Sequence, residues 1–386
     1  MGINSNIFIC NKIYYWFIRQ SMNILFIVDN NSYDMLRFIN LFKTRNNISV
    51  DIQKLLKKKE ISELQKYLYR LVKKKKITHL IIQTLQNFNW EILIFLKKEF
   101  NLKLILISPD CPYNYDNLNR GILELFDLLY TFHVDYLKKY IRKGINAKFF
   151  TEPKFINYKN TKKKFDISFV GRGKNRVERK KILDDLKSLK NIKTKFLLDQ
   201  EISDYKMIKI IKQSKIHLNF TDTSSATIFG TGWSNKRKVN SFKGRIINIL
   251  GANTFCLSQN DSVTKKLFPN GKGVIYFNNI EDLKKKLLFY INNDKKRSEI
   301  ISKIDKKYLS NFSHKTVKKR IMAELKNLNF SNKKNPKVNY NFVIIFFQLR
   351  NLVRLCLLFR SKKEFFFILK RIFFLLKSSF RIIFKF

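Results

Sequence analysis

The sequence predicts an α/β protein that contains two doubly wound domains in tandem. Short apolar runs alternate with helical segments along most of the chain, and the alternation restarts after a lysine-rich break at 151–164. Such alternation predicts βαβ units with parallel sheets. Because 45% of the 386 residues are hydrophobic, the chain has enough apolar material for packed cores.

The first series of elements begins with the run MNILFIV at 22–28, which predicts a buried strand of a parallel sheet. Later apolar runs predict strands at 79–83, 103–107 and 128–132. The segments between them predict helices at 33–45, 60–74, 90–100 and 134–143. Gly144 is placed to end the last of these helices.

The second series begins at Asp166 and repeats the same theme. Strands are expected at 167–171, 193–198, 216–220, 254–258 and 273–277. Helices are expected at 177–189, 204–214, 242–251 and 279–293. We therefore expect one domain over 22–150, a linker over 151–164 and a second domain over 165–330. A ligand is expected in the cleft at the carboxyl ends of the strands.

Both ends of the chain differ from these domains. Residues 1–21 are expected to be an extension without a secretory signal, with Met22 as an alternative start. The tail over 331–386 is basic and aromatic, and its longest uncharged run, 338–349, is shorter than the ~20 residues that span a bilayer. Basic residues at helical spacings predict amphipathic helices that bind an anionic membrane surface through 340–386. Packing of this tail on the domains or on another subunit is the alternative.

The formal net charge is +49, which attracts polyanions such as nucleic acid, anionic lipid or phosphorylated substrates. A chain rich in Lys, Asn and Ile can also reflect an AT-rich genome, so the charge alone names no partner. We find no recognition-helix, zinc-finger or RNP-type signature, and specific nucleic-acid binding is the least favoured interpretation. The four cysteines share no metal-binding spacing, which indicates a reducing compartment without disulfides.

Two basic segments of the second domain are candidates for binding a diphosphate. In DISFVGRGKNR, over 166–176, glycines after a strand allow close backbone approach and basic side chains neutralise charge. In SFKGRIINILG, over 241–251, Lys243 and Arg245 begin a helix and can stabilise a departing diphosphate without a metal ion. Ordinary turn glycines and a solvated basic helix face are the alternative interpretations.

These motifs occur in an order that resembles the carboxyl-terminal half of a GT-B glycosyltransferase. The resemblance is closest to the family named for a spore-maturation protein, near the family 4 enzymes. The matching segments are DISFVGRGKNRVERKKILDDL, SKIHLNF, FKGRIINILGANTFCLSQ, GKGVIYFNNIEDLKKKLLFYINNDKKRSEI and YLSNFSHKTVKKRI. The first half matches more loosely, through NILFIV, SPDCP and FDLLYTFHVDYLKKYIRKGI. The resemblance covers about 22–330 and implies two Rossmann-like domains facing a cleft, with a final helix that crosses back to the first domain.

The resemblance implies a hexosyltransferase-type enzyme that moves a sugar from a nucleotide-sugar donor without a metal ion or cofactor. The implied acceptor is an envelope polysaccharide, a lipid-linked glycan or a protein, and the implied location is the cytoplasmic face of the membrane. The expected donor-binding residues are Gly171, Arg172, Arg176, Asp222, Lys243, Arg245 and Asn248. Candidates for the catalytic base are Asp29 and Asp110, which follow strands of the first domain. Capping of a turn is the alternative role for both carboxylates.

Asn248 departs from the family pattern, which commonly has a Glu at this position to hold the donor ribose. An amide oxygen accepts a hydroxyl hydrogen bond but lacks the charge assistance that strengthens it. The donor is therefore held differently, bound more weakly, or not used at all. In the last case the protein is a non-catalytic GT-B scaffold in envelope or coat assembly. We expect His133 and His217, which lie beside or within apolar strands, to be structural.

Overall fold

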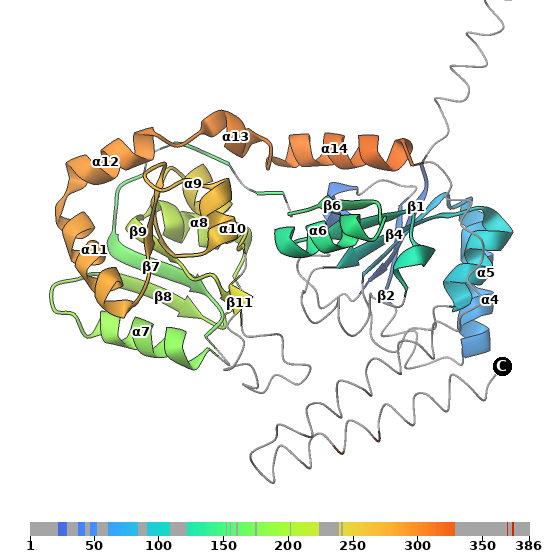
Figure 1. Ribbon diagram of the computed structural model, residues 1–386, viewed down its shortest axis with the longest axis horizontal. Coiled ribbons are helices and arrows are strands. Elements are labelled where there is room, and N and C mark those ends of the chain that lie inside the picture. The colour runs from blue at the N-terminus through green and yellow to red at the C-terminus, as the bar shows by residue number, and fades with distance from the viewer. Residues whose placement is uncertain are drawn as a thin grey trace, which may run out of the picture.

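The computed structural model contains two parallel sheets, each flanked by helices, as Figure 1 shows. The structure describes residues 22–28, 38–42, 47–51, 61–83, 91–108, 122–151, 153–154, 156–159, 161–173, 176–200, 202–223, 239–240, 242–328, 369 and 373. The α/β class predicted from the sequence is therefore confirmed.

The first sheet has the strand order β2-β1-β3-β4-β5-β6, with every neighbouring pair parallel. Its strands are β1 (Ile24–Val28), β2 (Ile48–Asp51), β3 (His79–Gln83), β4 (Lys103–Ser108), β5 (Leu128–Thr131) and β6 (Ala147–Phe149). The connecting helices described are α4 (Ile61–Lys75), α5 (Glu91–Phe100), the 3₁₀ turn η2 (Leu123–Leu125) and α6 (Val134–Arg142). The predicted C-terminal glycine of α6, Gly144, has φ of 71°.

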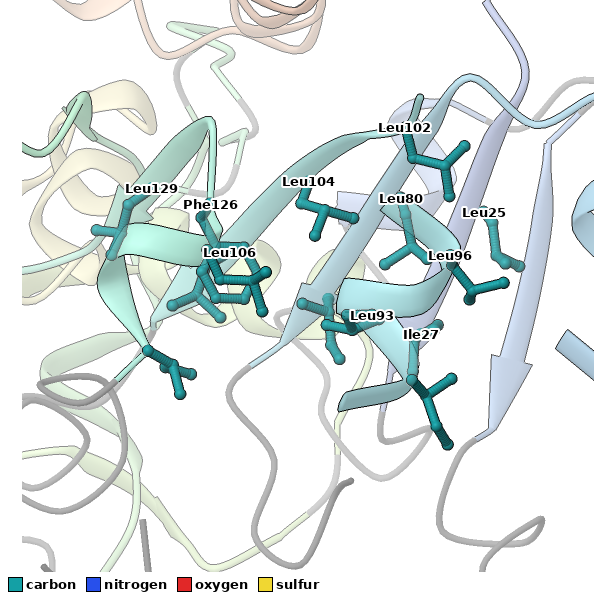
Figure 2. Packing of buried hydrophobic residues seen from close by; sticks show 14 of the residues in the cluster. Leu25, Ile27, Leu80, Leu93, Leu96, Leu102, Leu104, Leu106, Phe126 and Leu129 are labelled. Carbon is teal, nitrogen blue, oxygen red and sulfur yellow. The ribbon is translucent and has the colours of Figure 1, made fainter. Parts of the chain in front are cut away.

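One hydrophobic core lies between this sheet and helices α4 and α5. Figure 2 shows Leu25, Leu80 and Leu104 on three neighbouring strands and Leu93 and Leu96 on α5, all within one cluster. These five side chains are fully buried. Strands buried on both faces need continuous apolar runs, which is why the sequence revealed them.

The second sheet has the strand order β13-β12-β9-β7-β8 and is also parallel throughout. Its strands are β7 (Phe165–Gly171), β8 (Thr194–Leu198), β9 (Ser214–Asn219), β12 (Phe255–Gln259) and β13 (Val274–Phe277). A short antiparallel pair, β10 (Asp222–Thr223) with β11 (Val239–Asn240), lies beside it. The helices are α7 (Val177–Lys187), α8 (Asp204–Lys212), α9 (Arg245–Gly251), α10 (Ser262–Leu267), α11 (Ile280–Asn292), α12 (Asp294–Ser302), α13 (Lys306–Ser310) and α14 (His314–Lys326).

The last helix, α14, packs on the first sheet rather than on the second. Val317, Ile321 and Leu325 are fully buried in a cluster with Ile24 and Phe26 of β1. Figure 1 shows α13 and α14 running along one side of the molecule from the second sheet towards the first. The chain therefore passes between the sheets twice, and the two passages touch where the Lys154 amide donates to the Phe312 carbonyl at 2.8 Å.

Among the residues described, no helix combines the length and apolar character needed to cross a bilayer. The predicted membrane-binding tail lies outside the described residues, apart from the exposed helical residues Leu369 and Phe373. The predicted extension over 1–21 also lies outside them.

Candidate functional site

The second sheet has a topological switch point between β7 and β9. From β7 the chain moves outward to β8 on one side, and later strands build the sheet outward from β9 on the other. In open α/β sheets this arrangement opens a crevice at the carboxyl ends of the two central strands. Here those ends are Gly171 of β7 and Asn219 of β9. The candidate site is therefore built around these two positions.

The guanidinium group of Arg245 covers Gly171. A Cβ atom placed on Gly171 would lie 2.5 Å from one Arg245 terminal nitrogen and 3.2 Å from its Cζ atom. The same Cζ atom is 4.8 Å from the centre of the Phe169 ring, which supports the guanidinium by a cation–π contact. Two predicted donor-binding residues from separate motifs thus meet at the switch point, and a side chain at 171 would have to displace the guanidinium or the Phe169 ring.

The loop after β7 is fixed by Asp199, which follows β8. Both Asp199 carboxylate oxygens accept from the Gly173 amide, at 3.0 and 3.1 Å, and the Asp199 amide donates to the Gly171 carbonyl at 3.1 Å. Asp199 has φ of 55°, a left-handed conformation that Asp tolerates better than most residues. The Gly173 amide is thus engaged by a carboxylate and does not donate to an anion at this loop.

Arg179 on α7 holds the rings beneath the site, a role that the sequence did not reveal. It is buried, and its Nη1 donates to the Arg172 carbonyl at 2.9 Å. Its Cζ atom lies 5.3 Å from the Phe220 ring centre and 5.7 Å from that of Phe169. Phe169 therefore contacts both Arg179 and Arg245, which couples the buried support to the exposed loop.

Uncharged polar groups line the sheet below the arginine. Ser168 Oγ and His217 Nδ1 lie 2.6 Å apart, and Asn219 Nδ2 donates to Ser258 Oγ at 3.0 Å. Burial, helped by the nearby Arg245 charge, holds the pKa of His217 well below its usual range. A neutral, fully buried His217 agrees with the structural role predicted for it. His133, the other histidine expected to be structural, directly precedes α6, and its side chain makes no capping hydrogen bond to the helix.

The amino-terminal end of α9, the helix that contains Arg245, packs against the linker. A Cβ atom on Gly244 would lie 2.8 Å from Lys154 Nζ and 3.2 Å from Thr151 Oγ1. Lys154 and Thr151 are both buried. The start of α9 is therefore held between the end of β7 and the linker, which fixes the direction of the Arg245 side chain.

The other predicted donor-site residues take different places. Lys243 precedes α9 and is half-buried, whereas Asn248 is buried on its second turn. Arg172 is exposed. Arg176 is the N-cap residue of α7 and makes no side-chain capping bond, and its amide donates to the Gly173 carbonyl at 3.0 Å. Asp222 lies in β10, opposite Asn240.

The two candidates for the catalytic base, Asp29 and Asp110, lie outside the described residues. Asp29 follows β1 directly, and Asp110 is the second residue after β4. Both assignments therefore stay predictions. Within the described part of the chain, no group of three His, Cys, Asp or Glu residues is placed to hold a metal ion.

Comparisons with known proteins agree with this architecture. Residues 161–323 match the family described as glycosyl transferase-like. The fold is similar to that of Anabaena HepE in complex with UDP-glucose, with TM-score 0.56 and 13% identity over 80% of this chain and 100% of that one. A glycosyltransferase from Rickettsia africae gives TM-score 0.54 and 13% identity over 81% of this chain and 100% of that one. No curated protein sequence matches the chain.

A third similar structure is sucrose-phosphate synthase from Thermosynechococcus elongatus, with TM-score 0.51 and 9% identity over 84% of this chain and 93% of that one. At these identities the structural likeness establishes the fold alone. The fold is GT-B, with two Rossmann-like domains, as the resemblance implied.

Proposed function

We propose that the protein transfers a sugar from a nucleotide-sugar donor, because residues 161–323 match the glycosyl transferase-like family and the fold is GT-B. The observation that best supports this proposal is the position of the Arg245 guanidinium over Gly171, at the switch point of the second sheet. A cation supported by a ring at the mouth of this crevice suits a diphosphate. Because HepE forms complexes with UDP and with UDP-glucose, UDP-sugars are the first donors to test.

In the proposed reaction an acceptor hydroxyl oxygen forms a bond to the anomeric carbon of the donor. The bond from that carbon to the diphosphate breaks, and its electron pair stays on the diphosphate. Arg245, with Lys243, stabilises the charge that develops there, so no metal ion is required. The hydroxyl proton passes to a carboxylate of the first domain, for which Asp29 and Asp110 are the candidates.

We propose an envelope polysaccharide, a lipid-linked glycan or a protein as the acceptor, with the sugar a hexose. The support is the basic aromatic sequence at 340–386, which suits attachment to the cytoplasmic face of a membrane. An enzyme held there is close to acceptors that are built at the membrane.

Calorimetric titration of the full chain with UDP, GDP, their monophosphates and several nucleotide sugars tests the donor site. We expect saturable binding of one nucleoside diphosphate, weakened at least roughly tenfold by Arg245→Gln because a charge-assisted contact is lost. Arg142→Gln, on the exposed end of α6, is the matched control and leaves binding unchanged. A folded protein that binds none of these nucleotides would contradict the proposal.

Asn248→Glu separates an active enzyme from the scaffold alternative. If the residue contacts the donor ribose, the carboxylate restores charge assistance and strengthens donor binding severalfold. Nucleotide binding without sugar transfer to any acceptor, in both wild type and variant, would favour the non-catalytic scaffold.

A further inference from the structure

The outer face of α4 carries a stripe of basic side chains. Leu64, Leu68 and Val72 point from α4 into the core beneath the first sheet. The opposite side of the helix exposes Lys66, Arg70, Lys73 and Lys74. These residues lie away from the donor site, in the domain that does not carry Arg245.

Aromatic side chains from α4 and the neighbouring α5 lie beside this stripe. The Tyr69 ring centre is 5.0 Å from that of Phe100 and 5.9 Å from that of Phe95. Lys73 Nζ lies 5.9 Å from the Tyr69 ring. Phe95 is 36% exposed, and Tyr67, on the other edge of the stripe, is 37% exposed. Together with Lys98 of α5, these residues form what we call the α4–α5 face.

The stability of α4 does not explain this stripe. Lysines in the last turn favour a helix through its dipole, which accounts for Lys73 and Lys74 but not for Lys66 and Arg70. Like charges three and four residues apart, as in Lys66–Arg70 and Arg70–Lys74, destabilise a helix. The acidic residues described on this face are Glu63 in the first turn of α4 and Glu99 near the end of α5. The stripe therefore carries more positive charge than the stability of the helix requires, and an anionic partner would neutralise it.

We propose that the α4–α5 face is a docking surface for an anionic lipid bilayer. Lysine and arginine stems cover apolar surface while their charged ends reach phosphate head groups. Aromatic rings with one apolar edge exposed are favoured at the boundary between head groups and acyl chains. A helix pair with basic and aromatic residues on one face matches both requirements.

The arrangement of the aromatic rings favours a bilayer over nucleic acid as the partner of the α4–α5 face. Stacking of bases needs free ring faces along a groove. Tyr69 instead contacts Phe95, Phe100 and the Lys73 ammonium group, so its ring is already part of a packed ridge. The docking surface is independent of the proposed sugar transfer, and it is separate in sequence from the tail at 340–386.

Co-sedimentation of the full chain with phosphatidylcholine vesicles, with and without phosphatidylglycerol, tests this surface. We expect binding that requires phosphatidylglycerol and that falls roughly fivefold for each basic residue changed to Gln at 66, 70, 73 and 74. The matched control changes four exposed lysines of α14, a helix without aromatic residues: Lys315, Lys318, Lys319 and Lys326. These changes leave vesicle binding unchanged. Equal losses from the two sets, or no loss from the α4 set, would overturn the proposal.

A second measurement locates the bilayer without removing charge. Phe95→Trp places a fluorophore on the α4–α5 face, and Val177→Trp places one on α7, where the side chain is 81% exposed. Brominated phosphatidylglycerol is expected to quench the added tryptophan at 95 strongly and the one at 177 weakly. Equal quenching overturns the proposal. The proposal is also overturned if the variant with the four α4 changes loses binding of single-stranded RNA but keeps vesicle binding. That result would assign the α4–α5 face to nucleic acid.

Discussion

Tyr130 on β5 donates a 2.7 Å hydrogen bond to Glu324 on α14, although 194 residues separate the two in sequence. The Tyr130 ring is fully buried, and burial together with Glu324 raises the pKa of its hydroxyl far above the usual value. The contact therefore joins a neutral phenol to the last helix and fixes α14 on the first sheet.

Tyr130→Phe removes this bond and leaves the Glu324 carboxylate without the phenol. We expect the free energy of unfolding to fall by ~1–3 kcal/mol, measured by denaturant titration. Tyr205→Phe, at a ring that is 77% exposed, is the control and has no effect. Equal stability of the two variants would show that the hydrogen bond does not hold α14.

The same helix makes stability depend on pH through His79 of β3. Its Nε2 atom lies 3.1 Å from the Leu325 carbonyl oxygen. Burial lowers the pKa of His79 from 6.5 to about 4; the Leu325 hydrogen bond opposes this shift, Lys103 adds to it and Asp127 opposes it. The folded protein therefore keeps the ring neutral while the unfolded chain takes up a proton near pH 6.5.

His79 makes its full contribution to the free energy of unfolding above pH 6.5. As the pH falls towards 4, the free energy of unfolding decreases by up to ~3 kcal/mol, because the unfolded chain binds a proton at this residue and the folded protein does not. We expect His79→Gln to flatten the pH dependence of unfolding in this window, whereas His314→Gln, at an exposed position, keeps it. A slope that survives His79→Gln would contradict the assignment.

Gly171→Ala tests the position of Arg245 directly. The new methyl group would overlap the guanidinium, so nucleotide affinity is expected to fall at least roughly tenfold, which calorimetry measures. The control is Gly144→Ala, which has open space around it but a φ of 71°. That variant loses ~1 kcal/mol of stability and keeps its affinity. The prediction fails if both variants bind nucleotide as the wild type does.

Asp199→Asn tests how the loop after β7 is held. Asn tolerates the left-handed backbone but loses the charge that strengthens the bond from the Gly173 amide. We expect hydrogen exchange at the Gly173 amide to become faster, by roughly tenfold. Asp184→Asn on the exposed side of α7 leaves that exchange unchanged. An unchanged rate in Asp199→Asn would mean that the loop is fixed by other contacts.

The central strands of both sheets could be predicted because they are buried on both faces. β3 was predicted with its bounds, and β4 lacked only Ser108. The edge strands β2 and β6 were not predicted, because they are only four and three residues long and each has one buried residue. The edge strands β8 and β13 were predicted, because both contain apolar runs. A four-residue run such as ISVD carries no continuous apolar signal.

The residues of the candidate site could likewise be predicted only in part. The sequence marked Gly171 and Arg245 by their motifs, and the fold brings them together. It did not mark Asp199 or Arg179, because their roles depend on contacts between elements that only the folded sheet places side by side. Nothing about an Asp after a strand distinguishes one that holds a glycine amide from one that caps a turn.

The return of α14 to the first sheet has a consequence for synthesis on the ribosome. The first sheet is translated early, and Phe38 and Phe42 pack on Phe26, but Val317, Ile321 and Leu325 complete the cover of this face only when the last helix has emerged. One apolar face of the first sheet therefore stays partly uncovered while the second domain is translated. Partly exposed apolar surface of this kind favours aggregation until the residues through 328 have left the ribosome.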